Sequence, residues 1–326
     1  MIFIYNPDTL EKSDILVNTT SIQWTERFYE AGGFEIHFDE DNEHLIRGNI
    51  VSFGGMFGKI EKVSKTFNDI AIFGYDMKVL AKQRFCMGRE FESTDVETVF
   101  KTLIDENMIN ASDEDRNIPL LSLAENRHTG DEIDYKVENK TLSEVFNELA
   151  LKYEIGYSFS VDNGYIFDVK KGTDRSGDII FSRDFNNIDN VEYADDGLNE
   201  INFAYSKKEI TDEDGNGTGT YNILTFGTAK GIGRYEGYCE NADDAENYIA
   251  ENSAQETLTG EIADSTANLK YGIDYFLGDY VTVRFGDMSA VKQITEVKHV
   301  CEKANNKIDI IFGTEKNNPI KKLLKT

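Results

Sequence analysis

The same order of segments occurs twice in this chain, once near each end. Each copy has a strand-like segment that begins with Gly, then an Ile-x-x-Val segment, then an Ile-Phe-Gly segment: residues 48–53, 60–63 and 72–74 in the first copy, and residues 278–283, 294–297 and 311–313 in the second. The extra length of the second copy falls where hairpin loops would lie. Two copies are too few for a solenoid, which needs about three repeats. The pattern predicts two similar small β-barrels in one chain, with chance agreement between β-rich segments as the alternative.

Alternating apolar and polar residues predict strands in the N-terminal part. Ile22 and Trp24 precede a Gly-rich break at 31–33, and Phe34 and Ile36 follow it with the same spacing. Period-two spacing on both sides of a break is typical of a β-hairpin. Further strands are expected over 49–53, 58–66 and 69–75.

The middle of the chain has a different pattern. Residues 94–97 and 141–144 both run from Thr to Glu as capping boxes do, and each opens a segment with helical spacing of apolar residues. Residues 162–164, Asp-Asn-Gly, lie between two alternating segments and are typical of a tight hairpin turn. We therefore expect a compact α/β module over 89–176.

The expected fold class is mainly β with an α/β insertion: two similar small β-barrel domains plus an inserted α/β domain. Residues 1–88 would form the first barrel and 89–176 the inserted α/β domain. Residues 207–326 would form the second β-barrel with one helix, expected at about 242–258.

The charge balance restricts the partners of the chain. There are 60 Asp and Glu residues against 34 Lys and Arg residues, which gives a formal net charge of −26. DNA is densely negative, so such a surface repels it, and anionic membrane surfaces are disfavoured for the same reason. Net charge can also serve solubility alone. We expect no specific nucleic-acid binding.

The cysteines and the N-terminus indicate synthesis in a reducing compartment. Cys86, Cys239 and Cys301 are odd in number and widely spaced, so neither a disulfide framework nor a zinc site is expected. The N-terminus lacks the basic and long apolar regions of a signal peptide. No segment approaches the roughly 18 apolar residues of a membrane span. We expect a protein made in the cytoplasm, without stable membrane insertion.

The sequence contains no recognisable catalytic motif. The histidines His37, His44, His128 and His299 form no H-E-x-x-H pair, and no G-x-S-x-G segment is present. The Gly-rich segment 227–234 lacks the Gly-Lys-Ser/Thr ending of a phosphate loop and is interpreted as a turn. We expect no catalytic residue, no cofactor-binding residue, no cofactor and no metal ligand.

One segment is similar to the start of a calcium loop. Residues 212–217 place Asp, Asp and Asn at alternate positions before a Gly, as such loops do. The twelfth position, which should supply a bidentate carboxylate, is Ile223, and both flanks have strand-like patterns. A hairpin tip rich in turn-forming residues explains the segment more simply.

Three stretches resemble the tail and baseplate hub proteins of long-tailed phages and PBSX-like defective prophages. They are residues 21–36, with Ser-Ile-Gln-Trp-Thr-Glu-Arg-Phe; residues 181–205, with Phe-Ser-Arg-Asp-Phe-Asn-Asn and Asn-Phe-Ala-Tyr; and residues 277–297, with Leu-Gly-Asp-Tyr-Val-Thr-Val and Ile-Thr-Glu-Val. The likeness covers nearly the whole chain. Each motif is common in β proteins, so their order and spacing carry the resemblance.

This resemblance implies a structural hub subunit at the tip of a phage or phage-like tail. Hub subunits of this type have two related barrels and an inserted α/β domain, and they form homotrimers. Three chains with two barrels each would adapt the sixfold tail tube to a threefold tip and let DNA pass. The resemblance also implies that residues 177–206 return to complete the first barrel, and that acidic side chains lining the ring keep DNA from sticking.

The implied partners are the tail tube or distal tail protein, the tape measure, and spike or fibre proteins, at the virion tail tip or baseplate. Some tail-tip proteins of this type carry a cell-wall hydrolase after the hub region. Because the sequence ends at Thr326, directly after the second barrel, no built-in enzyme is expected. The alternatives are a tail-associated cell-wall hydrolase with its site in the α/β module, and a receptor- or carbohydrate-binding tail protein, supported by 21 Phe and 16 Tyr.

Overall fold

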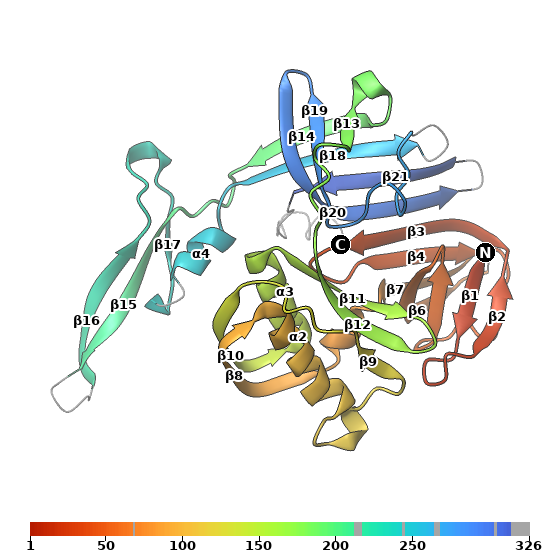
Figure 1. Ribbon diagram of the computed structural model, residues 1–326, viewed down its shortest axis with the longest axis horizontal. Helices are drawn as coiled ribbons and strands as arrows, with labels where there is room; N and C mark the ends of the chain where they lie inside the picture. The colour runs from red at the N-terminus through yellow and green to blue at the C-terminus, as the bar shows by residue number, and fades with distance from the viewer. Residues whose placement is uncertain (68, 212–216, 243–244, 264–267, 303–304, 314–326) are drawn as a thin grey trace. The chain divides into compact units, whose positions relative to one another are not determined.

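The structure is a computed structural model that describes residues 1–313 except 68, 212–216, 243–244, 264–267 and 303–304 (Figure 1). Strands take up 52% and helices 15%, which confirms the expected mainly β class. The described residues form two compact units, which we call the large unit (Met1–Val191 with Thr259–Gly313) and the small unit (Glu192–Leu258). Each is described by itself.

The first seven strands form one antiparallel sheet in the large unit, in the order β3-β4-β7-β6-β5-β1-β2. The hairpin predicted around residues 31–33 is confirmed, because β3 and β4 pair on either side of it. The strands are β1 (Ile2–Tyr5), β2 (Lys12–Leu16), β3 (Thr19–Arg27), β4 (Gly33–Phe38), β5 (Ile50–Phe53), β6 (Met56–Lys65) and β7 (Ile70–Asp76).

Six later strands extend the same sheet beyond β3. β20 pairs with β3, and the path continues through β21 and β18 to β14, while β19 pairs with β20 and β13 pairs in parallel with β19. These strands are β13 (Ile180–Ser182), β14 (Asp189–Asp196), β18 (Gln255–Ala263), β19 (Tyr280–Phe285), β20 (Met288–Glu302) and β21 (Asn305–Phe312), with a short 3-10 helix η3 (Arg183–Phe185) after β13.

The two closed barrels expected from the sequence are not confirmed. Among the described strands the hydrogen-bonded path is open, with β14 at one end and β2 at the other. Within residues 177–206, the segment expected to complete the first barrel, β13 pairs with β19 and β14 pairs with β18. The physical reason is that β20 already occupies the free edge of β3, so the N-terminal and C-terminal strands share one continuous sheet.

The repeated sequence pattern corresponds to a repeated structure. β5, β6 and β7 form one antiparallel meander, and β19, β20 and β21 form another. Gly48 donates its N–H to the carbonyl of Ile60 at 2.8 Å, and Gly278 donates to the carbonyl of Ile294 at 2.8 Å. The backbone N–H of each isoleucine donates in turn to the carbonyl of the residue that follows the glycine. The two glycines share a positive φ, +100° and +96°, which side chains rarely tolerate.

The Ile-Phe-Gly segments of the two copies do not align residue for residue in the structure, because their pairing with the Ile-x-x-Val strand differs by one residue. Val63 pairs with Ile72 in the first meander, whereas Val297 pairs with Ile310 in the second. Ile310, and not the Ile311 chosen from the sequence, is therefore the counterpart of Ile72. The two isoleucines that correspond are both fully buried, whereas Ile311 is only partly buried, so burial and not the Ile-Phe-Gly letters sets the register.

The correspondence extends to whole strand orders. The order β3-β4-β7-β6-β5 matches the order β14-β18-β21-β20-β19, strand for strand. We call β3–β7 the first repeat unit, and β14 with β18–β21 the second repeat unit. In the first unit a short turn connects β3 to β4, and in the second the chain of the small unit occupies the same connection, between β14 and β18.

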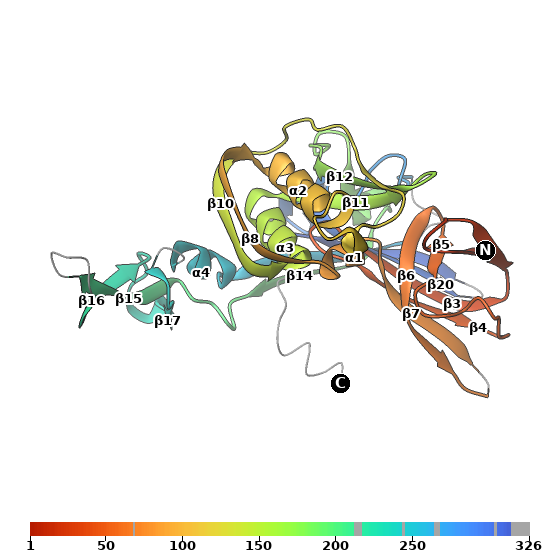
Figure 2. The same cartoon turned by 90° about the horizontal axis from the view of Figure 1, so that it is seen from below.

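The chain between the repeat units forms the α/β module of the large unit. Its helices α2 and α3 lie side by side (Figure 2), and Phe100 of α2 stacks on Phe146 of α3 with ring centroids 4.5 Å apart. β8 pairs with β10, and β12 pairs with β11 and β9. The elements are α1 (Val79–Lys82), β8 (Phe85–Asp95), α2 (Val96–Ile104), a π-helix η1 (Asp105–Ile109), a 3-10 helix η2 (Glu114–Arg116), β9 (Leu121–Leu123), β10 (Glu132–Thr141), α3 (Leu142–Tyr153), β11 (Ile155–Val161) and β12 (Tyr165–Lys171).

One of the two predicted capping boxes is confirmed. Thr141 and Glu144 form a reciprocal capping box at the start of α3. At α2 the prediction is wrong by one residue: Asp95 is the N-cap and accepts the N–H of Thr98 at 2.9 Å. Thr94 is not the cap because α2 begins at Val96, which places Asp95 directly before the helix, and the Thr94 hydroxyl donates instead to the carbonyl of Glu92 at 2.9 Å. Glu97 therefore does not cap α2, and its carboxylate instead forms an ion pair with Lys101.

Phe28 connects three parts of the large unit. Its side chain is 1% exposed, and its N–H donates to the carbonyl of Thr295 in β20 at 2.9 Å. A Cβ atom placed on Gly156 in the α/β module, or on Gly278 in the second repeat unit, would overlap the Phe28 ring. Both positions are glycine because the aromatic ring fills the space that a side chain would need.

The small unit has a sheet of its own. β15 (Phe203–Thr211) pairs with β16 (Gly217–Phe226) in antiparallel fashion and with β17 (Glu236–Tyr238) in parallel, and the unit also holds a 3-10 helix η4 (Gly231–Gly233) and a helix α4 (Ala245–Glu251). The helix expected at about 242–258 is shorter than predicted. The Asn252 side chain donates to the carbonyl of Tyr248 at 2.7 Å and closes the helix, and the chain is extended again from Gln255.

Candidate functional site

The histidines do not come together. The nearest carboxylate oxygens to their ring nitrogens are on different partners: Asp69 at 2.9 Å and Glu35 at 2.8 Å for His37, Glu43 at 3.9 Å for His44, Asp95 at 2.9 Å for His128 and Glu26 at 2.9 Å for His299. Across the described residues, no group of three or more His, Cys, Asp or Glu side chains is arranged to hold a metal ion.

In chain order, the calcium-like segment lies between β15 and β16, and the Gly-rich segment lies between β16 and β17. The calcium-like residues 212–216 lie outside the described residues, and the preceding and following residues belong to β15 and β16. The Gly-rich segment 227–234 is an irregular connection with a single 3-10 turn, as a turn interpretation requires. It leads into β17 and not into a long helix, so it lacks the strand-to-helix setting of a phosphate loop.

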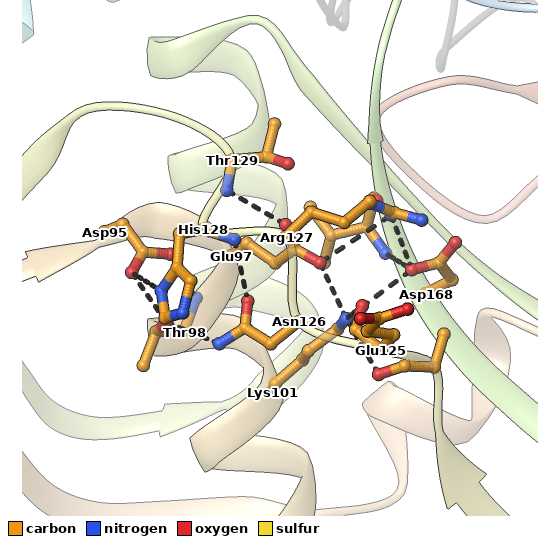
Figure 3. Close-up of polar contacts among 12 residues, drawn as sticks. Asp95, Glu97, Thr98, Lys101, Glu125, Asn126, Arg127, His128, Thr129 and Asp168 are labelled. Atoms are coloured by element: carbon orange, nitrogen blue, oxygen red, sulfur yellow. Dashed lines mark hydrogen bonds and ion pairs between the residues drawn. The ribbon is translucent and has the colours of Figure 1, made fainter.

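A buried ion-pair cluster lies at the start of α2 (Figure 3). Glu97 is fully buried, and Lys101 one turn later donates to its carboxylate at 2.6 Å. The Lys101 ammonium also donates to the carbonyls of Ala124 and Glu125, at 3.0 and 2.6 Å. All three protons of this ammonium therefore have acceptors.

The segment after β9 supplies the other half of the cluster. Arg127 forms an ion pair with Asp168 of β12 at 2.7 Å, and its guanidinium lies 3.6 Å from the Glu97 carboxylate. The backbone N–H of Thr129 donates to the second carboxylate oxygen of Glu97 at 2.9 Å. Figure 3 shows these side chains converging from α2, β12 and the segment between β9 and β10.

The N-cap of α2 is tied to the same segment. Asp95 accepts from the Thr98 hydroxyl at 2.7 Å and lies 2.9 Å from the His128 ring (Figure 3). The Asn126 amide donates to the Thr98 hydroxyl at 2.7 Å. A carboxylate at a helix N-terminus is stabilised by the free N–H groups and the helix dipole.

The electrostatics keep the cluster charged. Burial alone would raise the pKa of Glu97, but the hydrogen bonds from Lys101 and Thr129 outweigh it, and the pKa lies below its ordinary value. The hydrogen bond with Asp168 raises the pKa of Arg127 further. Glu97 is thus held as a carboxylate, since its charge is compensated on both oxygens.

The cluster is suited to holding the fold and not to acid–base chemistry. A general acid or base needs an open position for a substrate proton, whereas both oxygens of Glu97 and the ammonium of Lys101 are occupied by protein groups. These contacts join residues 124–131 to α2 and β12. The sequence signal that could have shown the pair is the Glu–Lys spacing of four residues in a helix, which was interpreted as part of a capping box.

A cavity of about 620 Å³ lies in the large unit, beside the joint between β3 and β20. Its polar lining includes Glu26, Lys170, Tyr271 and His299. Burial raises the pKa of Tyr271 and lowers the pKa of Lys170. The Glu26 carboxylate contacts the His299 ring at 2.9 Å, so these two groups bridge the joint at the wall of the cavity.

The comparisons with known proteins agree with this architecture. A prophage tail protein, gp18, from Listeria monocytogenes is 14% identical with a TM-score of 0.58, covering 100% of this chain and 99% of its own. A tail protein from Neisseria meningitidis is 13% identical with a TM-score of 0.59, covering 96% and 97%. The 43 kDa tail protein of prophage MuSo2 from Shewanella oneidensis is 13% identical with a TM-score of 0.58, covering 95% and 97%. At such identities these likenesses establish a shared fold.

The sequence itself gives the family. A comparison with curated proteins finds no match. Within the described part of the chain, every helix is too short or too polar to cross a lipid bilayer. A family profile described as siphovirus ReqiPepy6 Gp37-like protein matches residues 1–314. Since that match covers nearly the full length, the chain belongs to this family of phage tail proteins.

Proposed function

We propose that this chain is a structural hub subunit at the tip of the tail, and that it works as a homotrimeric ring. Its two repeat units are the two barrel-like domains of the hub, and residues 89–176 form the α/β domain inserted after the first. Three chains then present six similar units, which adapts a sixfold tail tube to a threefold tip. The ring encloses a passage through which DNA leaves the tail.

The observation that carries the proposal is the match between the two repeat units. Equal strand order and the same Gly-to-Ile bond pair mean that both units offer similar edges and faces to their neighbours. A closed ring of similar contacts is the arrangement in which such units satisfy one another. The direct pairing of β20 with β3 supports it, because within one chain the second unit already continues the sheet of the first.

The proposed role is non-enzymatic, with no catalytic, cofactor or metal residue. It is supported by the ion-pair cluster, whose groups are occupied by protein partners. The net charge of −26 supports passage of DNA without specific binding, since acidic side chains facing the passage repel the duplex over roughly 8 Å at physiological salt. The proposed partners are the tail tube or distal tail protein, the tape measure, and spike or fibre proteins.

Gold-labelled antibody against the chain, applied to purified tails and viewed by electron microscopy, tests the location. Label confined to the tail tip is the expected result, and label along the tube or on the capsid contradicts the proposal. Purified chain should leave cell-wall gels uncleared and should not bind host cells in a saturable way. Clearance would replace the hub with the hydrolase alternative, and saturable binding would replace it with the receptor alternative.

A further inference from the structure

The joint between the two repeat units of one chain has a defined chemistry. Residues Glu296–Glu302 of β20 pair with Ser21–Arg27 of β3 in antiparallel register. Arg27 lies 2.7 Å from the Glu296 carboxylate directly opposite. Glu26 and His299 add a second contact across the same joint at 2.9 Å. The joint therefore combines sheet pairing with cross-strand ion pairs.

Each strand of this joint has a counterpart in the other repeat unit, and each counterpart has an edge that pairs with no described strand. β6 corresponds to β20, and β14 corresponds to β3. β6 pairs with β5 only over Met56–Lys59, and no described strand pairs with that edge over residues 61–65. β14 ends the hydrogen-bonded path, and most of its side chains are exposed. Open strand edges of this kind are templates for pairing with another chain.

The two leftover edges are complementary in charge. Lys62 lies two residues after Ile60, as Glu296 lies two residues after Ile294, and Lys65 corresponds in the same way to His299. Both lysines are exposed. β14 carries the acidic sequence Asp-Asn-Val-Glu-Tyr-Ala-Asp-Asp. The internal joint has ion pairs at these positions, so a basic β6 edge against an acidic β14 edge reproduces its chemistry with β6 supplying the positive charge.

Apolar side chains near these edges agree with the same arrangement. The β5–β6 hairpin ends in Phe-Gly-Gly-Met, and its Phe53 and Met56 line the same cavity as Cys301 of β20. The β19–β20 hairpin ends in Phe-Gly-Asp-Met, and its Phe285 is 38% exposed. Phe67, which lies seven residues after Ile60 as Cys301 lies seven after Ile294, is fully exposed at 102%.

We propose that β14 of one copy of this chain pairs in antiparallel fashion with the β6 edge at residues 61–65 of a second copy. The acidic side chains of β14 meet Lys62 and Lys65, and the β19–β20 hairpin tip of the first copy covers Phe67 of the second. Sheet extension of this kind gives affinity through backbone hydrogen bonds and specificity through side chains. The interface rests on the proposed trimeric ring and names the surface that closes it.

The charge pairing is tested with the full-length chain by light scattering. Lys62→Glu with Lys65→Glu should reduce a trimer to a monomer, and Glu192→Lys with Asp195→Lys should do the same. A chain with all four changes again has opposite charges on β14 and on the β6 edge of the neighbouring copy, and it should form the trimer again. Lys136→Glu, at an exposed position of the α/β module, is the matched control and should stay trimeric. Circular dichroism confirms that each variant is folded.

A photo-reactive phenylalanine analogue at position 67 gives a second readout. Cross-links from it should reach residues 285–288 of another copy, as identified by mass spectrometry. A wild-type trimer whose mass is unchanged in both charge-reversed variants, with no such cross-link, overturns this interface and leaves the ring standing. A wild-type chain that is monomeric at every concentration overturns the ring and the interface together.

Discussion

Gly48 and Gly278 occupy the same place in two repeated structures, each with a positive φ and each donating its N–H to an isoleucine carbonyl at 2.8 Å. They differ in their surroundings. A Cβ atom on Gly48 would meet no heavy atom within 4 Å, whereas one on Gly278 would overlap the ring of Phe28. One glycine is therefore required by its backbone conformation alone, and the other by its conformation and its packing.

Gly278→Ala should destabilise the protein more than Gly48→Ala. The positive φ costs about 1–3 kcal/mol at either position. Only at Gly278 would the added methyl group also overlap the Phe28 ring, and this overlap should lower the free energy of unfolding by about a further 1–3 kcal/mol. Scanning calorimetry should give a clearly lower Tm for Gly278→Ala, and equal Tm values would contradict the packing around Phe28.

Phe28→Ala should cost about 3–5 kcal/mol, because a large buried ring is removed from a packed interior. The same change opens the space beside Gly278. Adding Gly278→Ala to Phe28→Ala should then cost no more than Gly48→Ala does in the wild type. A double-mutant cycle from denaturant unfolding measures this coupling, and additive effects would show that the two residues do not share the space.

Lys101→Met should destabilise the α/β module by about 3–5 kcal/mol, because it leaves the Glu97 carboxylate buried with its main charge partner removed. Lys136→Met is the matched control, since Lys136 forms an exposed pair with Glu138 and such pairs contribute at most about 1 kcal/mol. Thermal unfolding followed by circular dichroism compares the two. Similar losses in both variants would mean that the cluster contributes no more than a surface ion pair.

The contribution of Glu97 should depend on pH. Its pKa is lower in the folded protein than the ordinary value of 4.5, so its stabilising effect is complete above pH 4.5 and is lost as pH falls through the folded pKa. Glu97→Gln removes this effect. The Tm difference between wild type and Glu97→Gln should therefore be constant near neutral pH and shrink on acidification, and a difference that grows in acid would reverse the assignment.

The features visible in the sequence are those that depend on local chemistry. Gly48 and Gly278 were found because a positive φ and an alternating strand leave a repeated pattern. The start of α3 was predicted because Thr141 and Glu144 cap it within a few residues of chain. The cap of α2 was placed one residue too early, because Thr94 and Asp95 are both suitable capping residues and the local pattern does not show that the helix begins at Val96.

The remaining features depend on contacts between distant residues. The pairing of Val297 with Glu26 joins the repeat units into one sheet, yet neither strand signals its partner in its own alternation. Residues 207–258 of the small unit were assigned to the second barrel because they lie in sequence directly before the strands of the C-terminal part. Glu97 and Lys101 have the spacing of a helical pair, but only the fold brings Arg127 and Asp168 to them.

The central claim, that three chains provide six similar units, is tested most directly by the mass of the full-length protein in solution, measured by multi-angle light scattering. The chain has a mass of 37.0 kDa, and the account predicts a particle of three times that mass. A particle of twice that mass would contradict it, since two chains cannot match a threefold tip.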